Sequence, residues 1–385
     1  MTKILHILTD FPFKRNDEMI NYGGLGICAL QLIEGAKDAG YEVDILTRGD
    51  SGIDSELCGG VYRTGYIALT KSRNWKMTHS FTLIPKLLYL LLTKKYDLVH
   101  VHNPPAALFA APMAKLFKIP VVMTMHGPWA KVRDRFKGLA KKIETHSLRY
   151  PDVVTFDGEA LKGEFESVYG ADGRFVAIVN AVDTVKFKRL DKNDCRELLG
   201  LPKDKKLILY SGRSVYGKNI HAIQELARLL PDTAFVIAGE RINSFGNIIN
   251  LGVVPNTKMP LVYNACDCLI LDSIAEGMSR AVLEAMACGC AVLLSDIPSN
   301  REIIGDSGCG RIFSSVEQAA IDITVLSRES MAEMGEKGIE RVEGAFRVHD
   351  RLYRFIDIYI KLIGKKRQSG ATAVAQTVGE KSTTI

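Results

Sequence analysis

The sequence predicts an α/β protein with two lobes, each built on a parallel sheet with helices on its faces. Short apolar segments alternate with helical segments along most of the chain, an order that is typical of parallel sheets. The alternation stops in a polar stretch near residues 180–206 and then starts again, as expected for two Rossmann-like lobes. At 385 residues the chain is also long enough for two domains, each with its own core.

The first lobe begins with an apolar strand at Ile4–Leu8. A glycine-rich loop at 22–26 opens a helix that ends at Gly40, and a second strand follows at Tyr41–Leu46. Further strands are predicted at Asp97–Val101, Pro120–Met125 and Asp152–Phe156.

The second lobe begins with a strand at Leu207–Tyr210, a loop at Ser211–Lys218 and a helix from Asn219 to Leu230. Later strands are predicted at Ala234–Ala238, Ile248–Leu251, Cys268–Leu271 and Ala291–Leu294, with a short helix at Leu261–Ala265. An amphipathic run from Met331 ends in a helix at Leu352–Ile363. The polar tail 365–385 is expected to be disordered.

Composition and charge narrow the function classes. No signal peptide or membrane-spanning segment is evident, and the eight cysteines lack a Cys-x-x-Cys pair, which favours buried thiols in a cytoplasmic protein. The stretch 131–149 carries a local net charge of +5. This is either a solvated helix face or a patch for anionic lipid or a phosphorylated acceptor. Nucleic acid is not expected as a partner, because no nucleic-acid-binding motif accompanies the charge.

The stretch 276–289 combines two acids with a helix start. Glu276 lies in a glycine-containing turn after one strand, and Glu284 lies in a run of helix formers that Gly289 stops before the next strand. In a βαβ unit this helix start lies at the carboxyl edge of the sheet, where its backbone N–H groups suit a phosphate. The two glutamates would flank whatever the phosphate carries.

Other candidate groups follow strands in the same way. Gly24 and Gly26 belong to the glycine-rich loop, which suits either a diphosphate or an acceptor, or is simply a tight turn. His126 directly follows a strand and could hydrogen-bond a substrate hydroxyl. His100 and His102 share one strand face, and we interpret them as strand-end packing or hydrogen-bonded histidines and not as metal ligands, since no third ligand is evident.

Two cations, Arg213 and Lys218, lie five residues apart on the loop after the first strand of the second lobe. Arginine offers a planar fork and lysine a point charge, so the pair suits a diphosphate. The chain has no Walker-type pattern, so ATP hydrolysis is not indicated.

Together these motifs resemble those of retaining GT-B glycosyltransferases, the group (glycosyl transferases group 1) that contains α-mannosyltransferases, glycogen synthases and sucrose synthases. The most specific part is Glu276 with Glu284–Gly289. Supporting parts are Gly23–Gly26, His126, Asn180–Asp183, Arg213 with Lys218, Gly252–Pro255 and Glu302. The resemblance reaches about residue 364 and implies two Rossmann-like parallel-sheet lobes that face a central cleft. Residues 1–180 would form an acceptor-side lobe completed by a crossover helix at 349–364, and residues 181–348 a nucleotide-sugar-binding lobe.

The resemblance also implies roles for the candidate residues. Arg213 and Lys218 would neutralise the departing diphosphate, which makes a metal unnecessary, and Glu284 would bind the ribose. Glu276 and His126 would contact the donor sugar. The remaining donor-binding residues would be Gly24, Gly26, Gly277, Met278, Ser279 and Arg280. Met278 and Ser279 depart from the commoner Phe-Gly, so the identity of the donor is not inherited.

The implied function is metal-independent, retaining transfer of a hexosyl or N-acetylhexosaminyl group from a UDP- or GDP-sugar. The nucleotide sugar is a substrate, so no cofactor is expected. The expected acceptor is a glycan or lipid-linked intermediate of a surface polysaccharide, and the expected location is cytoplasmic, peripheral on an anionic inner membrane face. A GT-B nucleotide-sugar epimerase and a non-catalytic, membrane-docked nucleotide-sugar-binding subunit are the alternatives.

Overall fold

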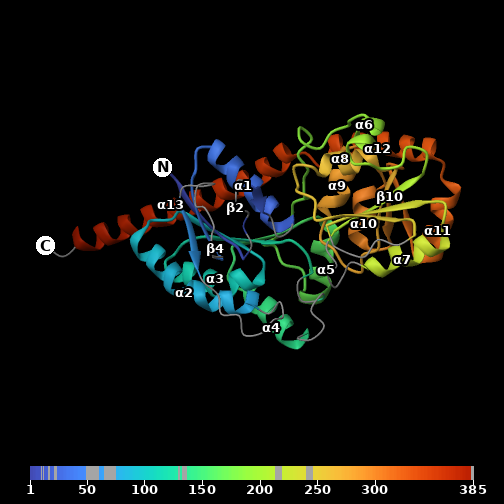
Figure 1. Cartoon of the computed structure of the whole chain (residues 1–385). Coiled ribbons are helices and arrows are strands. Elements are labelled where there is room, and N and C mark those ends of the chain that lie inside the picture. Colours follow the sequence, from blue (N-terminus) through green and yellow to red (C-terminus); the bar gives the residue numbers. More distant parts are fainter. Residues whose placement is uncertain are drawn as a thin grey trace. The chain divides into compact units, whose positions relative to one another are not determined.

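The computed structural model describes residues 1–9, 11, 13–15, 18–20, 24–48, 60–64, 75–128, 131, 137–212, 219–239 and 246–382. The chain forms two compact units. Unit 1 comprises Met1–Thr155, Tyr169–Val176 and Leu352–Ile385, and unit 2 comprises Phe156–Val168 and Ala177–Arg351. Each unit is an α/β structure (Figure 1), so the predicted fold class, two domains with parallel sheets, is confirmed.

The main sheet of unit 1 has seven strands in the order β5-β4-β1-β6-β7-β8-β9. Their bounds are β1 Lys3–Ile7, β4 Glu42–Arg48, β5 Val61–Thr64, β6 Leu98–His102, β7 Val121–Met125, β8 Val153–Phe156 and β9 Phe175–Ala177. β1 pairs in parallel with both β4 and β6. The strand order therefore reverses between β1 and β6, and ligands of such sheets bind at the carboxyl ends beside this point.

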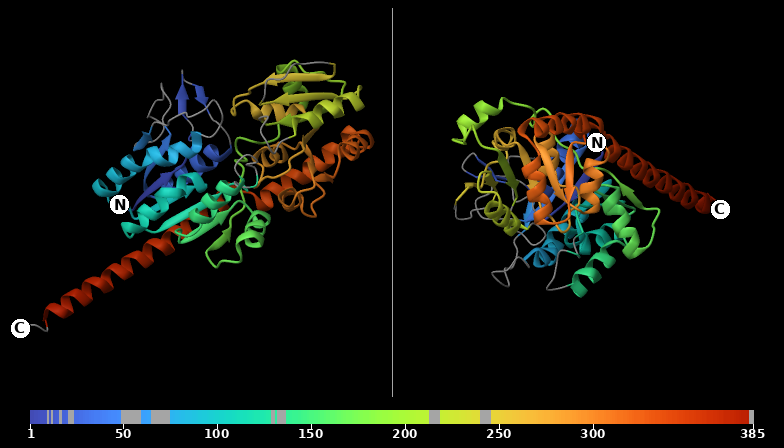
Figure 2. Two further views of the ribbon diagram at one scale, coloured as in Figure 1. Left: turned by 90° about the horizontal axis from the view of Figure 1, so that it is seen from below. Right: turned by 90° about the vertical axis from the view of Figure 1, so that its right-hand side faces the viewer.

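Helices cover both faces of this sheet (Figure 2). They are α1 Gly24–Asp38, α2 Trp75–Thr93, α3 Pro104–Leu116 and α4 Lys137–Ser147. On one face α3 packs between α2 and α4. On the other, buried side chains of α1 such as Ile33 form an apolar cluster with Leu8 and Ile45, and Ile356 of α13 (Val348–Ser382) packs against it. A small antiparallel hairpin, β2 (Phe13–Arg15) and β3 (Glu18–Ile20), completes the described elements of unit 1.

The sheet of unit 2 has six strands in the order β12-β11-β10-β13-β14-β15, and all their pairings are parallel. Their bounds are β10 Leu207–Ser211, β11 Ala234–Ala238, β12 Ile248–Gly252, β13 Cys268–Leu271, β14 Ala291–Ser295 and β15 Gly310–Phe313. The order reverses between β10 and β13, so a ligand of this unit is expected at the carboxyl ends of these two strands.

Helices lie on both faces of the sheet of unit 2 (Figure 1). The helices assigned to unit 2 are α5 Glu159–Tyr169, α6 Lys192–Leu198, α7 Ile220–Leu229, α8 Met259–Ala265, α9 Arg280–Ala287, α10 Pro298–Ile304, α11 Val316–Val325 and α12 Arg328–Ala345. α9 packs against α8 and α12, whereas α7 packs against α11. Seven of the eight cysteines lie in the described part of the chain, and all seven are buried free thiols, as predicted.

Two boundaries differ from those expected from the sequence. The lobes were expected to divide at residue 180, but unit 2 already includes residues 156–168. The reason is that Glu302 accepts hydrogen bonds from the backbone N–H groups of Glu159 and Ala160, both at 2.8 Å, and so holds the start of α5 to unit 2. The tail 365–385 was expected to be disordered, whereas α13 continues through Ser382, over residues that include helix formers such as Ala, Gln and Glu.

Within the described residues, no helix has both the length and the apolar composition that crossing a bilayer requires.

Candidate active site

The start of α9 is the centre of the candidate site in unit 2. Ser279 occupies the N-cap position, and its side chain makes no capping hydrogen bond to the helix. The first N–H groups of an α-helix have no intrahelical partner, so this end of α9 is suited to bind an anion. Gly277, Met278 and Ser279 are buried beside this helix start.

Glu284 lies one turn into α9 and is held by two donors. Its side chain accepts hydrogen bonds from the Arg280 guanidinium at 3.2 Å and from the Tyr263 hydroxyl at 3.1 Å. Glu284 is 5% exposed and Arg280 9%, so this is a buried ion pair. Burial, followed by the charge of Glu284, raises the pKa of Tyr263 well above its usual value, so Tyr263 stays a neutral donor. The Glu284 carboxylate is thus held in place by one cationic donor, Arg280, and one neutral donor, Tyr263.

Lys186 is a further cation in this neighbourhood that the sequence reasoning missed. Burial lowers its pKa, the negative charge of Glu284 opposes this, and the positive charge of Arg280 adds to it. Lys186 Nζ donates a hydrogen bond to Asn256 Oδ1. It lies shortly after the Asn180–Asp183 motif, but nothing in the local pattern distinguishes it from a surface lysine.

Glu276 lies in the loop between β13 and α9 and is partly buried. Its carboxylate accepts a hydrogen bond from Ser273 Oγ at 3.1 Å. The backbone of Ser273 is fixed in turn by Ser295, whose Oγ accepts from the Ser273 N–H at 2.9 Å and donates to its carbonyl at 2.6 Å. The loop that carries Glu276 is therefore tied to the carboxyl end of β14.

Asn180 ties the same loop to a second polar network. Its Nδ2 donates to the Met278 carbonyl at 3.2 Å, and its Oδ1 accepts from Arg351 at 2.5 Å. Arg351 also pairs with Asp157 at 2.9 Å. In the sequence, Asn180 was part of the Asn180–Asp183 motif that supports the family resemblance, and no role was assigned to it. The structure shows that it supports the backbone of the candidate site.

Arg213 and Lys218 lie outside the described residues, but both ends of their loop are placed. Gly212 follows β10, and its N–H donates to the Ala238 carbonyl at 2.9 Å. Asn219 is bound to Asp272, which follows β13, through its N–H at 2.8 Å and its Nδ2 at 2.9 Å. The loop therefore starts and ends at the carboxyl ends of β10 and β13, where the strand order of unit 2 reverses.

In unit 1, the candidate residues also follow strands. α1 begins at Gly24, and Gly26 is buried in its first turn. His126 follows β7, is partly buried, and donates its backbone N–H to Asn103 Oδ1 at 3.2 Å. Asn103 has φ 68° and ψ 158°, a conformation that is strained for a residue other than glycine. Such strain is typical of functional sites, and apart from the two prolines that follow Asn103, no local pattern in the sequence indicates it.

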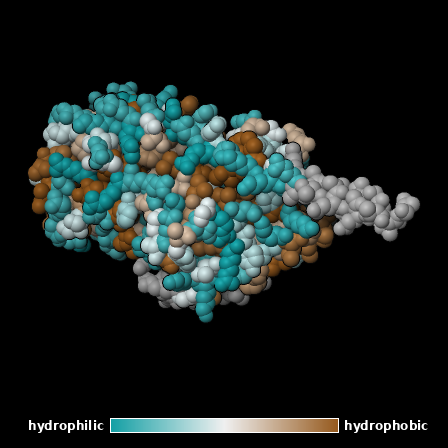
Figure 3. Space-filling model, turned by 180° about the vertical axis from the view of Figure 1, so that it is seen from behind, coloured by the Kyte–Doolittle hydropathy of each residue, from teal (hydrophilic) through white to brown (hydrophobic). Residues whose placement is uncertain are grey.

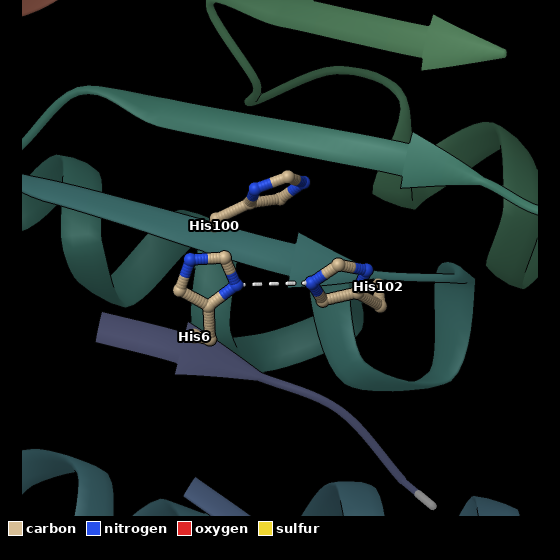
Figure 4. A group of neighbouring side chains, drawn as sticks. All are labelled: His6, His100 and His102. Atoms are coloured by element: carbon tan, nitrogen blue, oxygen red, sulfur yellow. Dashed lines mark hydrogen bonds between the residues drawn. The ribbon is translucent and has the colours of Figure 1, made fainter. Parts of the chain in front are cut away.

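A third histidine, His6, lies beside His100 and His102, and the sequence pattern did not connect it with them. His6, His100 and His102 are buried together on β1 and β6, with one ring nitrogen of each within 4.8 Å of the others (Figure 4). His100 is hydrogen-bonded through both ring nitrogens, to Tyr359 at 2.6 Å and to Thr124 at 2.7 Å. A metal would have to displace one of these partners, so the contacts favour the interpretation of hydrogen-bonded histidines.

Two family models match the chain, one over each half. A model described as Glycosyltransferase Family 4 matches residues 22–186, and one described as Glycosyl transferases group 1 matches residues 191–341.

Two similar proteins match this chain over different lengths. A glycosyltransferase of Bacillus subtilis (strain 168) named for teichuronic acid biosynthesis is 28% identical over 253 residues, which are 64% of this chain and 65% of that protein. The UDP-Gal:alpha-D-GlcNAc-diphosphoundecaprenol alpha-1,3-galactosyltransferase of Escherichia coli is 24% identical over 374 residues, 89% of this chain and 95% of that enzyme.

Solved structures agree in fold. Sucrose-phosphate synthase from Thermosynechococcus elongatus gives a TM-score of 0.81 at 18% identity. The matched region covers 95% of this chain and 100% of the synthase chain. Anabaena HepE in complex with UDP and glucose gives 0.76 at 17% identity, with 93% and 99% covered. The solved structures share the GT-B fold of this chain. The two family models together span residues 22–186 and 191–341, so the chain belongs to the glycosyltransferases, with a Glycosyltransferase Family 4 first half and a Glycosyl transferases group 1 second half.

Proposed function

We propose that this chain is a retaining glycosyltransferase that moves a sugar from a UDP- or GDP-sugar to a hydroxyl of a lipid-linked glycan or surface-polysaccharide intermediate. The observation that carries the proposal is the start of α9. A helix end without a side-chain cap lies one turn before Glu284, a buried carboxylate held by Arg280 and Tyr263, and shortly after Glu276. In this proposal the helix end binds a phosphate, Glu284 binds the ribose and Glu276 binds the sugar.

Glu284 keeps the capacity to bind a ribose although two donors already hold it. An ionised carboxylate offers about four lone-pair sites, and Arg280 and Tyr263 occupy one each. The remaining sites can accept ribose hydroxyls, and the fixed carboxylate loses little side-chain entropy when it does so. In this proposal Glu276, on its anchored loop, binds hydroxyls of the donor sugar.

The leaving diphosphate needs positive charge, and the chain supplies it without a metal. Arg213 and Lys218 belong to the loop whose ends, Gly212 and Asn219, lie at the switch point of the unit 2 sheet. Cations placed there would stabilise the charge that develops as the sugar–phosphate bond breaks. Retention would follow from attack by the acceptor on the same face, with the departing phosphate taking the acceptor's proton.

The acceptor class rests on relatives and on a surface of unit 1. The E. coli relative is named for transfer to a sugar linked to diphosphoundecaprenol. In this chain, Phe81, Leu88 and Leu92 are exposed on α2 at spacings of seven and four residues, so they form one apolar stripe. Lys141 and Lys142 are exposed on α4, on the same face of the sheet. An apolar stripe together with exposed cations on the same face of a sheet is what an anionic membrane surface would bind. Figure 3 shows hydrophobic residues at several places on the visible surface.

A screen of nucleotide sugars for slow hydrolysis tests the activity without an acceptor. NMR of purified protein with a panel of UDP- and GDP-sugars should show release of nucleoside diphosphate and a free sugar, first formed as the same anomer as in the donor. Inversion at the anomeric carbon would refute retention, and conversion to a second nucleotide sugar would indicate an epimerase. The proposal would be refuted if the purified protein neither bound nor hydrolysed any nucleotide sugar of the panel.

Three variants assign the roles. Glu276→Ala should reduce turnover far more than nucleotide binding, whereas Lys218→Ala should weaken both. Glu333→Ala, an exposed carboxylate on α12, is the matched control and should change neither. Equal activity of Lys218→Ala and the wild type would contradict the charge-neutralising role.

Liposome co-sedimentation tests the membrane surface. Binding should need anionic lipid, weaken with salt, and fall when Leu88 and Leu92 are changed to serine. Leu229→Ser, an exposed leucine on α7, is the control. Binding that is indifferent to anionic lipid and to salt would rule out this surface.

A further inference from the structure

Three histidines on neighbouring strands of unit 1 form one hydrogen-bonded chain. His6 Nδ1 lies 3.2 Å from His102 Nε2, and His102 Nδ1 lies 3.1 Å from His126 Nε2. His6 comes from β1, His102 from the end of β6, and His126 follows β7. The chain thus runs from the buried centre of the sheet to its carboxyl edge.

The geometry of both contacts is that of directed hydrogen bonds. The ring planes of His102 and His126 differ by 13° and those of His6 and His102 by 24°, with ring centroids 5.4 Å and 5.5 Å apart. Each centroid separation equals the distance between the two nitrogens plus one ring radius on either side. The nitrogens therefore lie on the line between the ring centres, and each bond points along the ring plane, where the lone pair and the N–H bond lie.

The rings have little freedom to leave this arrangement. His100 stacks on His102 with centroids 4.4 Å apart and planes within 16°. His100 is itself fixed through Thr124 and Tyr359, and Thr124 Oγ1 lies 2.7 Å from Thr155 Oγ1.

Such a chain couples the tautomers of its members. A neutral histidine has one N–H donor and one acceptor nitrogen, so His102 must donate to one neighbour and accept from the other. In the first arrangement His6 Nδ1–H donates to His102, His102 Nδ1–H donates to His126 Nε2, and His126 carries its proton on Nδ1. In the second every proton is reversed, and His126 carries its proton on Nε2.

His6, at the buried end of the row of hydrogen-bonded histidines, decides between the two proton arrangements. His6 is 0% exposed, and its Nε2 has no hydrogen-bond partner among the described residues. Burial lowers the pKa of His6 to about 3, so this ring is neutral at physiological pH. The first arrangement leaves a lone pair without a partner at Nε2, and the second leaves an N–H group. Buried N–H groups without a partner are the rarer of the two, which favours the first arrangement.

We propose that His6 and His102 are positioning residues that hold His126 as the neutral Nδ1–H tautomer, with its Nε2 occupied by His102. In the context of the proposed function, on which the benefit rests, His126 then offers an N–H donor to an oxygen of the donor sugar. A neutral ring at this place also avoids repulsion with the positive charge that develops at the anomeric carbon.

The tautomer can be measured on the unliganded full-length protein. Long-range ¹H–¹⁵N NMR of ¹⁵N-histidine-labelled chain distinguishes a protonated from an unprotonated ring nitrogen, and the His126→Asn spectrum identifies the His126 signals. We expect protonated Nδ1 and unprotonated Nε2 for His126 at neutral pH. The opposite pattern in the wild type would overturn the proposal, and this result needs no variant to fold.

Two substitutions of His6 test the cause. His6→Asn keeps an N–H donor near the place of Nδ1 and should keep the His126 tautomer and most of the turnover. His6→Phe keeps a flat ring without a donor. It should shift His126 toward the Nε2–H form that unconstrained histidine prefers, and lower kcat about tenfold without changing nucleotide affinity. A folded His6→Phe protein with unchanged His126 signals would refute the coupling.

The two proposals fail separately. The NMR result stands even if no nucleotide sugar is a substrate, which would refute only the function. Activity together with a His126 tautomer that does not depend on His6 would refute only this inference.

Discussion

Replacing Glu284 by glutamine removes the negative charge between Arg280 and Tyr263 while the side chain keeps its size. Removing one partner of a buried ion pair costs about 3–5 kcal/mol, because the other charge stays buried without compensation. Glutamine still offers one oxygen as an acceptor, so we expect unit 2 to lose about 2–3 kcal/mol. For a domain of this size that corresponds to a Tm lower by about 4–12 °C.

The same substitution should weaken nucleotide binding. If the carboxylate accepts ribose hydroxyls, a charged acceptor is replaced by a neutral one, and a hydrogen bond to a charged group contributes about 1.5–3 kcal/mol. The Kd of UDP or GDP should rise roughly ten- to hundredfold. Differential scanning calorimetry of the full chain measures the first effect, and isothermal titration calorimetry the second.

A double-mutant cycle identifies the ion pair as the cause. Arg280→Met alone leaves Glu284 unpaired, and the double variant Glu284→Gln/Arg280→Met removes both charges. The double variant should lose about 0.5–3 kcal/mol less than the sum of the two single variants. Strict additivity, or a melting curve of Glu284→Gln that matches the wild type, would refute the reasoning. Glu333→Gln is the control.

Three further predictions follow from other contacts. Gly239→Ala should destabilise unit 2 by about 1–3 kcal/mol or more in thermal melting, since φ is +106° and the new Cβ would lie 2.8 Å from the Gly212 carbonyl oxygen. Gly40→Ala, at φ +86° in open space, should cost less, and an equal loss would argue against the clash. Burial would raise the pKa of Asp267, but Lys192 and other partners outweigh this and lower it. The ionised Asp267 carboxylate therefore stabilises the protein above about pH 4, and this contribution is lost as the pH falls further. In melting experiments at different pH values, Asp267→Asn should make the Tm decrease less steeply with falling pH in this acid range. Finally, EDTA should leave the rate of donor hydrolysis unchanged, and restoration of a lost rate by Mg²⁺ or Mn²⁺ would show that the loop cations are not sufficient.

The strands that the sequence predicted with the correct bounds lie inside the sheets. Ala234–Ala238 and Cys268–Leu271 are buried throughout and have a strand on each side, so they read as continuous apolar runs. β5, β9 and β15 were not predicted, and each is the edge of its sheet. Edge strands need no continuous apolar run, and β5 and β15 include Arg63 and Arg311. Their pairing depends on the neighbouring strand, which a local pattern does not show.

The acids of the candidate site were visible in the sequence because their spacing is local. Glu276 and Glu284 lie on one loop and the helix that follows it, so a single stretch of chain contains both. The groups that hold them come from elsewhere. Tyr263 is on α8, and Asn180 is 98 residues from Met278, whose carbonyl it binds.

The histidines show the same division. The sequence placed His126 at the carboxyl end of a strand, but it gave no reason to connect His126 with His6. That connection exists because β1 and β6 pair as neighbours although 90 residues separate them, and β7 lies next to β6. The sequence alone determined which residue types follow each strand. Only the strand order decided which of them meet, since side chains at parallel strand ends become neighbours through pairing and not through distance along the chain.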